Sequence, residues 1–386
     1  MARKRAEAKT STINRDIRSS SSALYGWPRS SMSPIAFRSR SELSKSVRPS
    51  RMCRAFAGPV SVLSLAAIAI SLSTLRITPR LHAQEASPVF QATTELVLVD
   101  VQVLHKRMNT PAGSLHAGDF RIFEDGVAQQ IRHFSRDELP LSVVLLFDLT
   151  ASVHGPLKRL SQEAKAALDR FKPQDEVAVM VYGESARLVD GFSRDRDRNA
   201  RAIEQAAAMN TSEEAYFNEA VYQAAGKLRE SGMPSSRPII IWLTDNIPDF
   251  PDSKHKPVHT EDDAVRALHE TGIVVAPLLL RDAKYLPLLA VMSPITSRMA
   301  KSHPPGDARK YAEWTGGQVI GLHGKEPGQR LGEMIDGLRA RYTLGYRPTQ
   351  SKPVGTFCKL HLELAPDGAL RHTEWTVLAR QGYYRR

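Results

Sequence analysis

The chain has 386 residues, of which 53 are Lys or Arg and 41 are Asp or Glu, and its formal charge is +12. This length allows one large domain or two medium domains with a proper core. Residues 1–54 hold 13 basic and 3 acidic side chains, whereas the part after residue 83 holds 38 of each sign. The body of the chain is therefore close to neutral, which excludes the basic surface expected of a nucleic-acid-binding protein.

Residues 1–83 have the organisation of a leader segment. A basic, Ser-rich opening is followed by 21 residues without a charge, 55–75, and then by the small-residue site Leu81-His82-Ala83. This order is typical of a secretory signal cleaved after that site, with Met52 as an alternative start. If the segment stays uncleaved, it is instead a membrane anchor. In both cases the rest of the chain is exported, so we expect an extracytoplasmic protein.

A β-rich module is predicted over residues 88–139. Val97, Val99, Val101 and Val103 alternate with other residues, and a period of two indicates a strand. Further along, Asp125-Gly126 separates two short strand-like runs, as expected for a tight hairpin turn.

Strands and helices alternate over residues 140–341. Strands are predicted over 141–147, 177–182, 238–244, 273–276 and 317–320, and helices over 157–171, 202–209, 220–228, 264–269, 307–315 and 331–341. This alternation predicts an α/β fold with a doubly wound, mainly parallel, Rossmann-like sheet. The Pro-rich stretch over 285–305 is predicted to be an insertion loop.

The sequence becomes β-rich again over residues 342–386. Leu360, Leu362 and Leu364 alternate within this segment, which indicates another strand. We expect this segment to pack with residues 88–139 and to form an accessory β module beside the α/β domain.

Polar side chains follow two of the predicted buried strands. Asp148, Thr150 and Ser152 come directly after the run 141–147, and Asp245 follows the run 238–244. Ligands of open α/β sheets bind at the carboxyl ends of the strands, and hard oxygen atoms are the ligands that Mg²⁺ and Ca²⁺ prefer. The spacing therefore predicts one divalent-cation site at this edge of the sheet.

These residues resemble the metal-ion-dependent adhesion site of von Willebrand factor type A domains, which has the pattern Asp-x-Ser-x-Ser, a Thr from a later loop, and an Asp after a central strand. Asp148 and Ser152 match the outer positions of the first motif, Thr150 stands at its middle position, and Asp245 matches the last carboxylate. The position of the loop Thr falls near Ala215. Thr211 and Ser212, a few residues earlier, are the candidates to replace it.

The flanking segments are similar to an exported family of von Willebrand factor type A-related proteins described from acidobacterial-type bacteria. The stretches that carry this similarity are 94–101, 119–126, 342–346 and 382–384. The resemblance implies a non-enzymatic binding module that holds Mg²⁺, or else Mn²⁺ or Ca²⁺. It also implies a protein partner that offers an acidic side chain to the ion.

Two alternatives stay open at this point. In the first, Asp148 caps the helix that follows it and the hydroxyl groups bond to loop amides, so that the chain is a metal-independent scaffold of the cell envelope. In the second, Ser152 is the nucleophile of an extracytoplasmic hydrolase with His154 as its base. The sequence has no Gly-x-Ser-x-Gly motif, which argues against the hydrolase.

Overall fold

The computed structural model describes residues 96–136, 138–231, 233–249, 259–280, 304–322, 326–368 and 373–386, all of which belong to one compact unit. The predicted leader and most of the predicted insertion loop lie outside the described residues. No helix of the described ranges is both long enough and apolar enough to span a bilayer.

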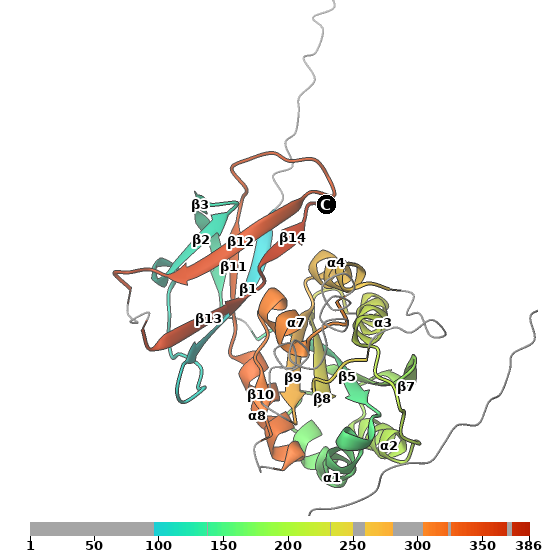
Figure 1. The fold of residues 1–386 in the computed structure, drawn as a ribbon. Helices are drawn as coiled ribbons and strands as arrows, with labels where there is room; N and C mark the ends of the chain where they lie inside the picture. The colour runs from blue at the N-terminus through green and yellow to red at the C-terminus, as the bar shows by residue number, and fades with distance from the viewer. Residues whose placement is uncertain are drawn as a thin grey trace, which may run out of the picture. The chain divides into compact units, whose positions relative to one another are not determined.

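A six-stranded sheet forms the centre of the α/β part (Figure 1), in the strand order β10-β9-β8-β5-β6-β7. Its strands are β5 (Leu141–Asp148), β6 (Glu176–Tyr182), β7 (Ala186–Ser193), β8 (Arg237–Thr244), β9 (Val274–Leu279) and β10 (Ile320–Gly321). All neighbouring pairs are parallel except β6 with β7, which is antiparallel. The predicted mainly parallel sheet is confirmed.

Helices cover both faces of this sheet. One face carries α1 (Ala151–Leu168), α2 (Arg196–Ala207) and α8 (Pro327–Arg339), and the other carries α3 (Phe217–Arg229), α4 (Glu261–Thr271) and α7 (Ala308–Thr315). Strand β5 is buried along its whole length because alternate residues enter the two cores: Val143 and Leu145 on one side, Val144 and Leu146 on the other. Burial on both faces explains its continuous apolar sequence, and the predicted doubly wound fold is confirmed.

Helix α1 begins earlier than its sequence predicts. The predicted start at residue 157 follows the rule that Pro interrupts helical hydrogen bonding, but the helix starts at Ala151 and contains Pro156. Val153, Leu157 and Leu160 are all fully buried against the sheet, so one apolar stripe runs through the Pro position and favours the longer helix. As a result, Ser152 lies in the first turn of α1.

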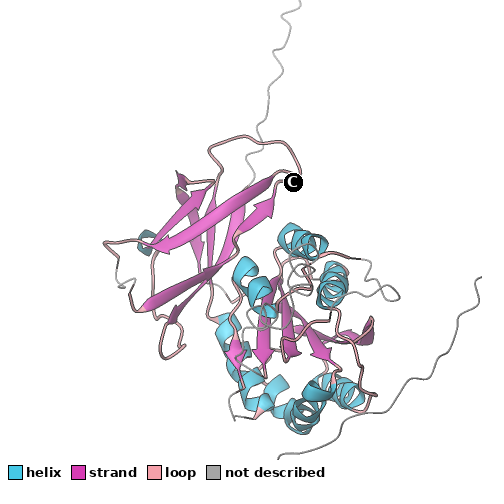
Figure 2. Cartoon of the chain, in the orientation of Figure 1, coloured by secondary structure: helices cyan, strands magenta, loops and turns pink. Residues whose placement is uncertain are grey.

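The first and last segments of the described residues form two further antiparallel sheets (Figure 2), β13-β1-β11-β4 and β14-β12-β2-β3. Their strands are β1 (Val97–His105), β2 (Phe120–Glu124), β3 (Val127–Gln129), β4 (Ile131–Ser135), β11 (Tyr342–Tyr346), β12 (Phe357–Leu364), β13 (Trp375–Ala379) and β14 (Gly382–Tyr384). Strand β1 pairs with β11 and β13, and β2 pairs with β12. Both sheets contribute to one apolar core, so the predicted accessory β module from the two terminal segments is confirmed.

Buried polar contacts join this β module to the α/β part. The Arg237 guanidinium, at the start of β8, donates from Nε and Nη2 to the Asp100 carboxylate of β1 at 2.9 and 3.2 Å. Gln102 Nε2 donates to the carbonyl oxygen of Gly337 in α8 at 2.8 Å. Because hydrogen-bonded pairs of opposite charge are costly to break once they are buried, these contacts fix β1 against the first residues of the parallel strands.

Candidate metal site

Two carboxylates meet at the carboxyl edge of the central sheet. Asp148 is the last residue of β5, and Asp245 directly follows β8. The two strands are parallel neighbours whose register pairs Phe147 with Leu243, so their ends lie side by side. Both acidic residues are buried, with 0% of Asp148 and 6% of Asp245 exposed.

Hydrogen bonds from three donors hold the carboxylate of Asp148. Its Oδ1 accepts from the backbone N–H of Thr150 at 2.8 Å, and its Oδ2 accepts from Tyr182 Oη at 2.9 Å and from Thr244 Oγ1 at 3.0 Å. Trp242 Nε1 in turn donates to Tyr182 Oη at 2.9 Å. This buried network fixes the orientation of the Asp148 side chain.

The two hydroxyl groups of the first motif connect the two carboxylates. Ser152 Oγ donates to Asp245 Oδ2 at 2.5 Å and lies 3.3 Å from Thr150 Oγ1. Asp245 Oδ1 accepts from the backbone N–H of Ile247 at 2.9 Å. The structure therefore brings together all four residues of the predicted principal site, Asp148, Thr150, Ser152 and Asp245.

Thr211 and Ser212 lie next to this group but make different contacts. Ser212 forms a β-bridge with Thr150, yet its Oγ donates to the carbonyl oxygen of Glu214 at 2.9 Å and accepts from the backbone N–H of Glu184 at 3.2 Å. Thr211 is exposed and lines an adjoining depression of about 520 Å³. The Ser212 hydroxyl is thus bonded to backbone groups of its own loop and of the turn between β6 and β7, and it has no hydrogen bond to the side chains of the other four residues.

The sequence profile of the von Willebrand factor type A domain matches residues 143–247. This range contains most of β5, all of β6, β7 and β8, and every residue of the site described above. The chain contains a von Willebrand factor type A-related domain. Type A domains are typically non-enzymatic modules of protein interaction, and they often bind a divalent cation.

Three solved structures illustrate the range of similar proteins. A von Willebrand factor type A protein from Catenulispora acidiphila is 13% identical, with a TM-score of 0.38 over 74% of this chain and 73% of that one. The PilB minor pilin from Streptococcus sanguinis is 11% identical, with a TM-score of 0.37 over 53% of this chain and 63% of the pilin. Proximal thread matrix protein 1 from the mussel byssus is 12% identical, with a TM-score of 0.37 over 60% and 51%.

The chain spans less than two thirds of the pilin and about half of the byssus protein. Similarities this low carry no information about function. The comparison with curated proteins finds no match.

The electrostatics of the type A site disfavour two negative charges without a cation. The pKa of Asp148 is raised to about 6 from its ordinary 3.8. Burial is the main cause and the charge of Asp245 adds to it, whereas the hydrogen bonds from Thr150 and Tyr182 act in the opposite direction. Burial also raises the pKa of Asp249, with Glu214 and Asp245 adding to the effect. A bound cation would relieve this repulsion.

The donor set fits a hard divalent cation. Asp148 and Asp245 supply carboxylate oxygens and Thr150 and Ser152 supply hydroxyl oxygens, and these are the ligand types of Mg²⁺, Mn²⁺ and Ca²⁺. Ser152 and Asp245 already place two of these oxygens 2.5 Å apart. The four residues would hold the ion, and the ion would supply a positive centre at this edge of the sheet.

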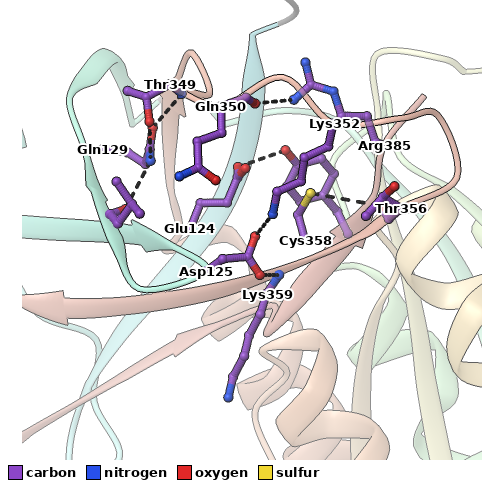
Figure 3. A network of polar contacts seen from close by, with 12 residues as sticks. Glu124, Asp125, Gln129, Thr349, Gln350, Lys352, Thr356, Cys358, Lys359 and Arg385 are labelled. Atoms are coloured by element: carbon purple, nitrogen blue, oxygen red, sulfur yellow. Dashed lines mark hydrogen bonds and ion pairs between the residues drawn. The ribbon is translucent and has the colours of Figure 1, made fainter.

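A second group of potential ligands lies in the β module (Figure 3). One ligand atom each of Glu124, Asp125 and Cys358 falls within 4.8 Å of the others. However, Glu124 Oε2 accepts from Tyr383 Oη at 3.0 Å, and Asp125 pairs with Lys352. Burial, together with Glu124, raises the pKa of the Cys358 thiol, whereas a metal needs the thiolate. This group does not fit a metal ion and instead stabilises the β module.

The geometry gives no support to a serine hydrolase. Ser152 Oγ donates to a carboxylate, and His154 Nδ1 is buried without a hydrogen-bond partner. A serine nucleophile needs a base within hydrogen-bond reach of its hydroxyl. No histidine of the described residues has a hydrogen bond to Ser152.

Proposed function

We propose that this protein is an exported binding module whose type A domain engages a protein partner through a divalent cation. Asp148, Thr150, Ser152 and Asp245 would hold the ion. A carboxylate of the partner would occupy a coordination position that the chain leaves to it, so that partner and ion bind together.

One observation supports this proposal above the others: oxygen-bearing side chains that follow two separate strands are linked by hydrogen bonds into a single group. Ser152 joins Asp245 to Thr150, and the Thr150 backbone joins this pair to Asp148. Helix α1 contributes to the arrangement, since its first turn places Ser152 beside Asp245. The network around Asp148 is buried and hence pre-organised, which reduces the cost of ordering ligands when an ion binds.

Isothermal titration with Mg²⁺, Mn²⁺ and Ca²⁺ tests the metal part of the proposal. The wild type should bind at least one of these ions, and Asp148→Asn and Asp245→Asn should each bind it at least about tenfold more weakly. Glu204→Gln is a suitable control, because it removes an exposed carboxylate of α2. Equal heats from the wild type and from both site variants would rule out the metal site.

The partner is tested by capture from an envelope fraction. A specific protein retained in Mg²⁺, released by EDTA and not retained by Asp245→Asn would support cation-dependent binding. Retention that does not depend on EDTA or on the variant would contradict it.

A metal-independent scaffold is the second candidate, and the hydrogen bonds around Asp148 favour it. Three donors satisfy this carboxylate without an ion, as they would in a helix-capping or loop-fixing role. The scaffold predicts that Asp245→Ala changes stability at most, with partner binding unchanged. The titration and the capture experiment therefore separate the two candidates.

Export is a further part of the proposal and follows from the leader pattern of residues 1–83. In a cell fractionation, the mature chain should be found outside the cytoplasm and should begin near Gln84 if the signal is cleaved. An N-terminal sequence that starts within the leader, from protein in the cytoplasmic fraction, would refute it.

A further inference from the structure

A groove lies at the amino ends of the parallel strands, on the side of the central sheet opposite to the candidate metal site. This groove of about 400 Å³ opens beside Arg237 and Val274, the first residues of β8 and β9. Asp245, in contrast, follows the last residue of β8. The groove is thus separate from the candidate metal site, and its volume is within the range of ligand-binding clefts.

Residues from both parts of the chain line this groove. Those that carry the following argument are Leu96, Leu98, Leu139, Arg237, His269 and Arg380. Their mixture of apolar walls and a few polar groups is typical of a site for an organic ligand.

Arg380 brings a positive charge to the groove, and no carboxylate of the described residues forms an ion pair with it. Its Nη2 donates to the carbonyl oxygen of Leu98 at 2.7 Å, and its Nε is buried without a hydrogen-bond partner. The carboxylate that favours the charged form of Arg380 is that of Asp100, which already accepts two hydrogen bonds from Arg237. Burial lowers the pKa of Arg380, as expected for a cation that is desolvated and only partly neutralised.

His269 supplies an unused polar atom at the same place. The residue is 4% exposed, and its Nδ1 has no hydrogen-bond partner. Burial and the neighbouring Arg380 lower its pKa to about 4, while the backbone of Gly382 favours the protonated ring. The ring is therefore neutral at physiological pH, and with its other nitrogen directed to Gly382, Nδ1 is left as a hydrogen-bond acceptor.

Exposed leucines form the apolar wall. Leu96 is 40% exposed and Leu98 is 50% exposed. The alternate residues of β1, Val97 and Val99, point into the core of the β module, so the two leucines lie on the opposite face of the strand. Neighbouring large apolar side chains on a surface often mark a binding site.

We propose that this groove binds the C-terminal end of a peptide whose last residue is apolar. The terminal carboxylate pairs with the guanidinium of Arg380, the amide N–H of the last residue donates to His269 Nδ1, and the apolar side chain packs on Leu96 and Leu98. The terminal carboxylate of the peptide supplies a negatively charged partner for Arg380. Hydrogen bonds between a guanidinium and a carboxylate are stronger than those between neutral groups. This site needs no metal ion and does not depend on the function proposed for the type A site.

The proposal is tested by fluorescence anisotropy with a labelled pentapeptide that ends in Leu-Leu, in the presence of EDTA. The free acid should bind the full chain, and the C-terminal amide should bind at least about tenfold more weakly, because it lacks the charge. Arg380→Gln should weaken binding of the free acid by a similar factor. Arg385→Gln removes the same charge from a neighbouring residue outside the groove and should leave binding unchanged.

A second variant keeps the test decisive if Arg380→Gln does not fold. Leu98→Glu places a negative charge at an exposed position of the wall and should abolish binding of the free acid without disturbing the core. Equal affinities for the acid and the amide, or no binding up to the solubility limit of the peptide, would overturn the proposal. Competition by octanoate as strong as that by the peptide would also overturn it, since a fatty acid has no amide N–H for His269.

Discussion

Without divalent cations, replacing Asp148 with Asn should stabilise the protein at neutral pH. The Asp148 carboxyl is fully buried, and its pKa is about 6, compared with 3.8 for an Asp side chain exposed to water. One pKa unit corresponds to about 1.4 kcal/mol, so keeping this group ionised in the folded state costs about 3 kcal/mol above pH 7. The Asn amide oxygen can still accept the Thr150 N–H, and the variant avoids the charge.

The effect should depend on pH in a defined window. Below pH 3.8 the carboxyl is protonated in both the folded and the unfolded chain, so its ionisation costs nothing. As the pH rises from 3.8 to about 6, the unfolded chain releases this proton while the folded chain keeps it, and the free energy of unfolding falls. Above about pH 6 both states are ionised and the cost stays constant.

Denaturant unfolding in EDTA measures this difference. The free energy of unfolding of Asp148→Asn minus that of the wild type should rise by about 2.5 kcal/mol between pH 4 and pH 7.5. Addition of Mg²⁺ at pH 7.5 should stabilise the wild type but not the variant. Glu204→Gln should behave like the wild type in both respects, with no pH-dependent difference from it and with the same stabilisation by Mg²⁺. A difference between Asp148→Asn and the wild type that is independent of pH would refute this account of the buried carboxyl.

Three further substitutions test the structure around the site and between the parts. Tyr182→Phe removes a buried hydroxyl that serves as both donor and acceptor and should lower the free energy of unfolding by about 2 kcal/mol in urea titrations. Gly317→Ala should cost about 3 kcal/mol or more, measured as a fall in melting temperature, because the new Cβ would lie 1.8 Å from the carbonyl oxygen of Val275. Arg237→Met leaves the Asp100 carboxylate without its main partner and should cost about 3 to 5 kcal/mol in the same assay. An unchanged unfolding curve for any one of these variants would contradict the contact it removes.

The central strands and the accessory module could be predicted because their sequence patterns are strong. The continuous apolar run of β5 reflects burial on two faces, and the alternation of β1 reflects burial on one. Asp148 and Asp245 each follow a continuous apolar run. Because parallel strands end at the same edge of a sheet, the two carboxylates could be predicted to lie close together.

Strand β7 could not be predicted in the same way. It is an antiparallel edge strand whose residues are mostly half-buried, and its register with β6 is interrupted by irregularities. An edge strand of this kind lacks both the continuous apolar run and the clean alternation that indicate a strand. Its place is set by pairing with β6, which the local sequence does not encode.

Tyr182 and Thr244 are the residues of the site that sequence analysis missed. Each is the last residue of its strand, and these strands flank β5 on its two sides. The register pairs Tyr182 with Asp148 directly. The available signal was that both strands next to β5 end on a polar residue. This signal can be used only when the strand order is known, and the sequence pattern does not determine that order.

The network around Asp148 bears on the choice between a cation site and a scaffold. Three hydrogen-bond donors surround this carboxylate, yet burial and Asp245 still hold its pKa near 6. An amide at this position would accept the Thr150 N–H and fix the loop without the electrostatic cost, so loop fixing alone does not account for a buried pair of carboxylates. A cation between them would turn the same repulsion into binding free energy, because each negative charge that destabilises the ion-free site would attract the ion. On the proposed cation site, the roughly 3 kcal/mol cost in EDTA and the strength of ion binding would be two measures of one charge arrangement, and Asp148→Asn should diminish both together.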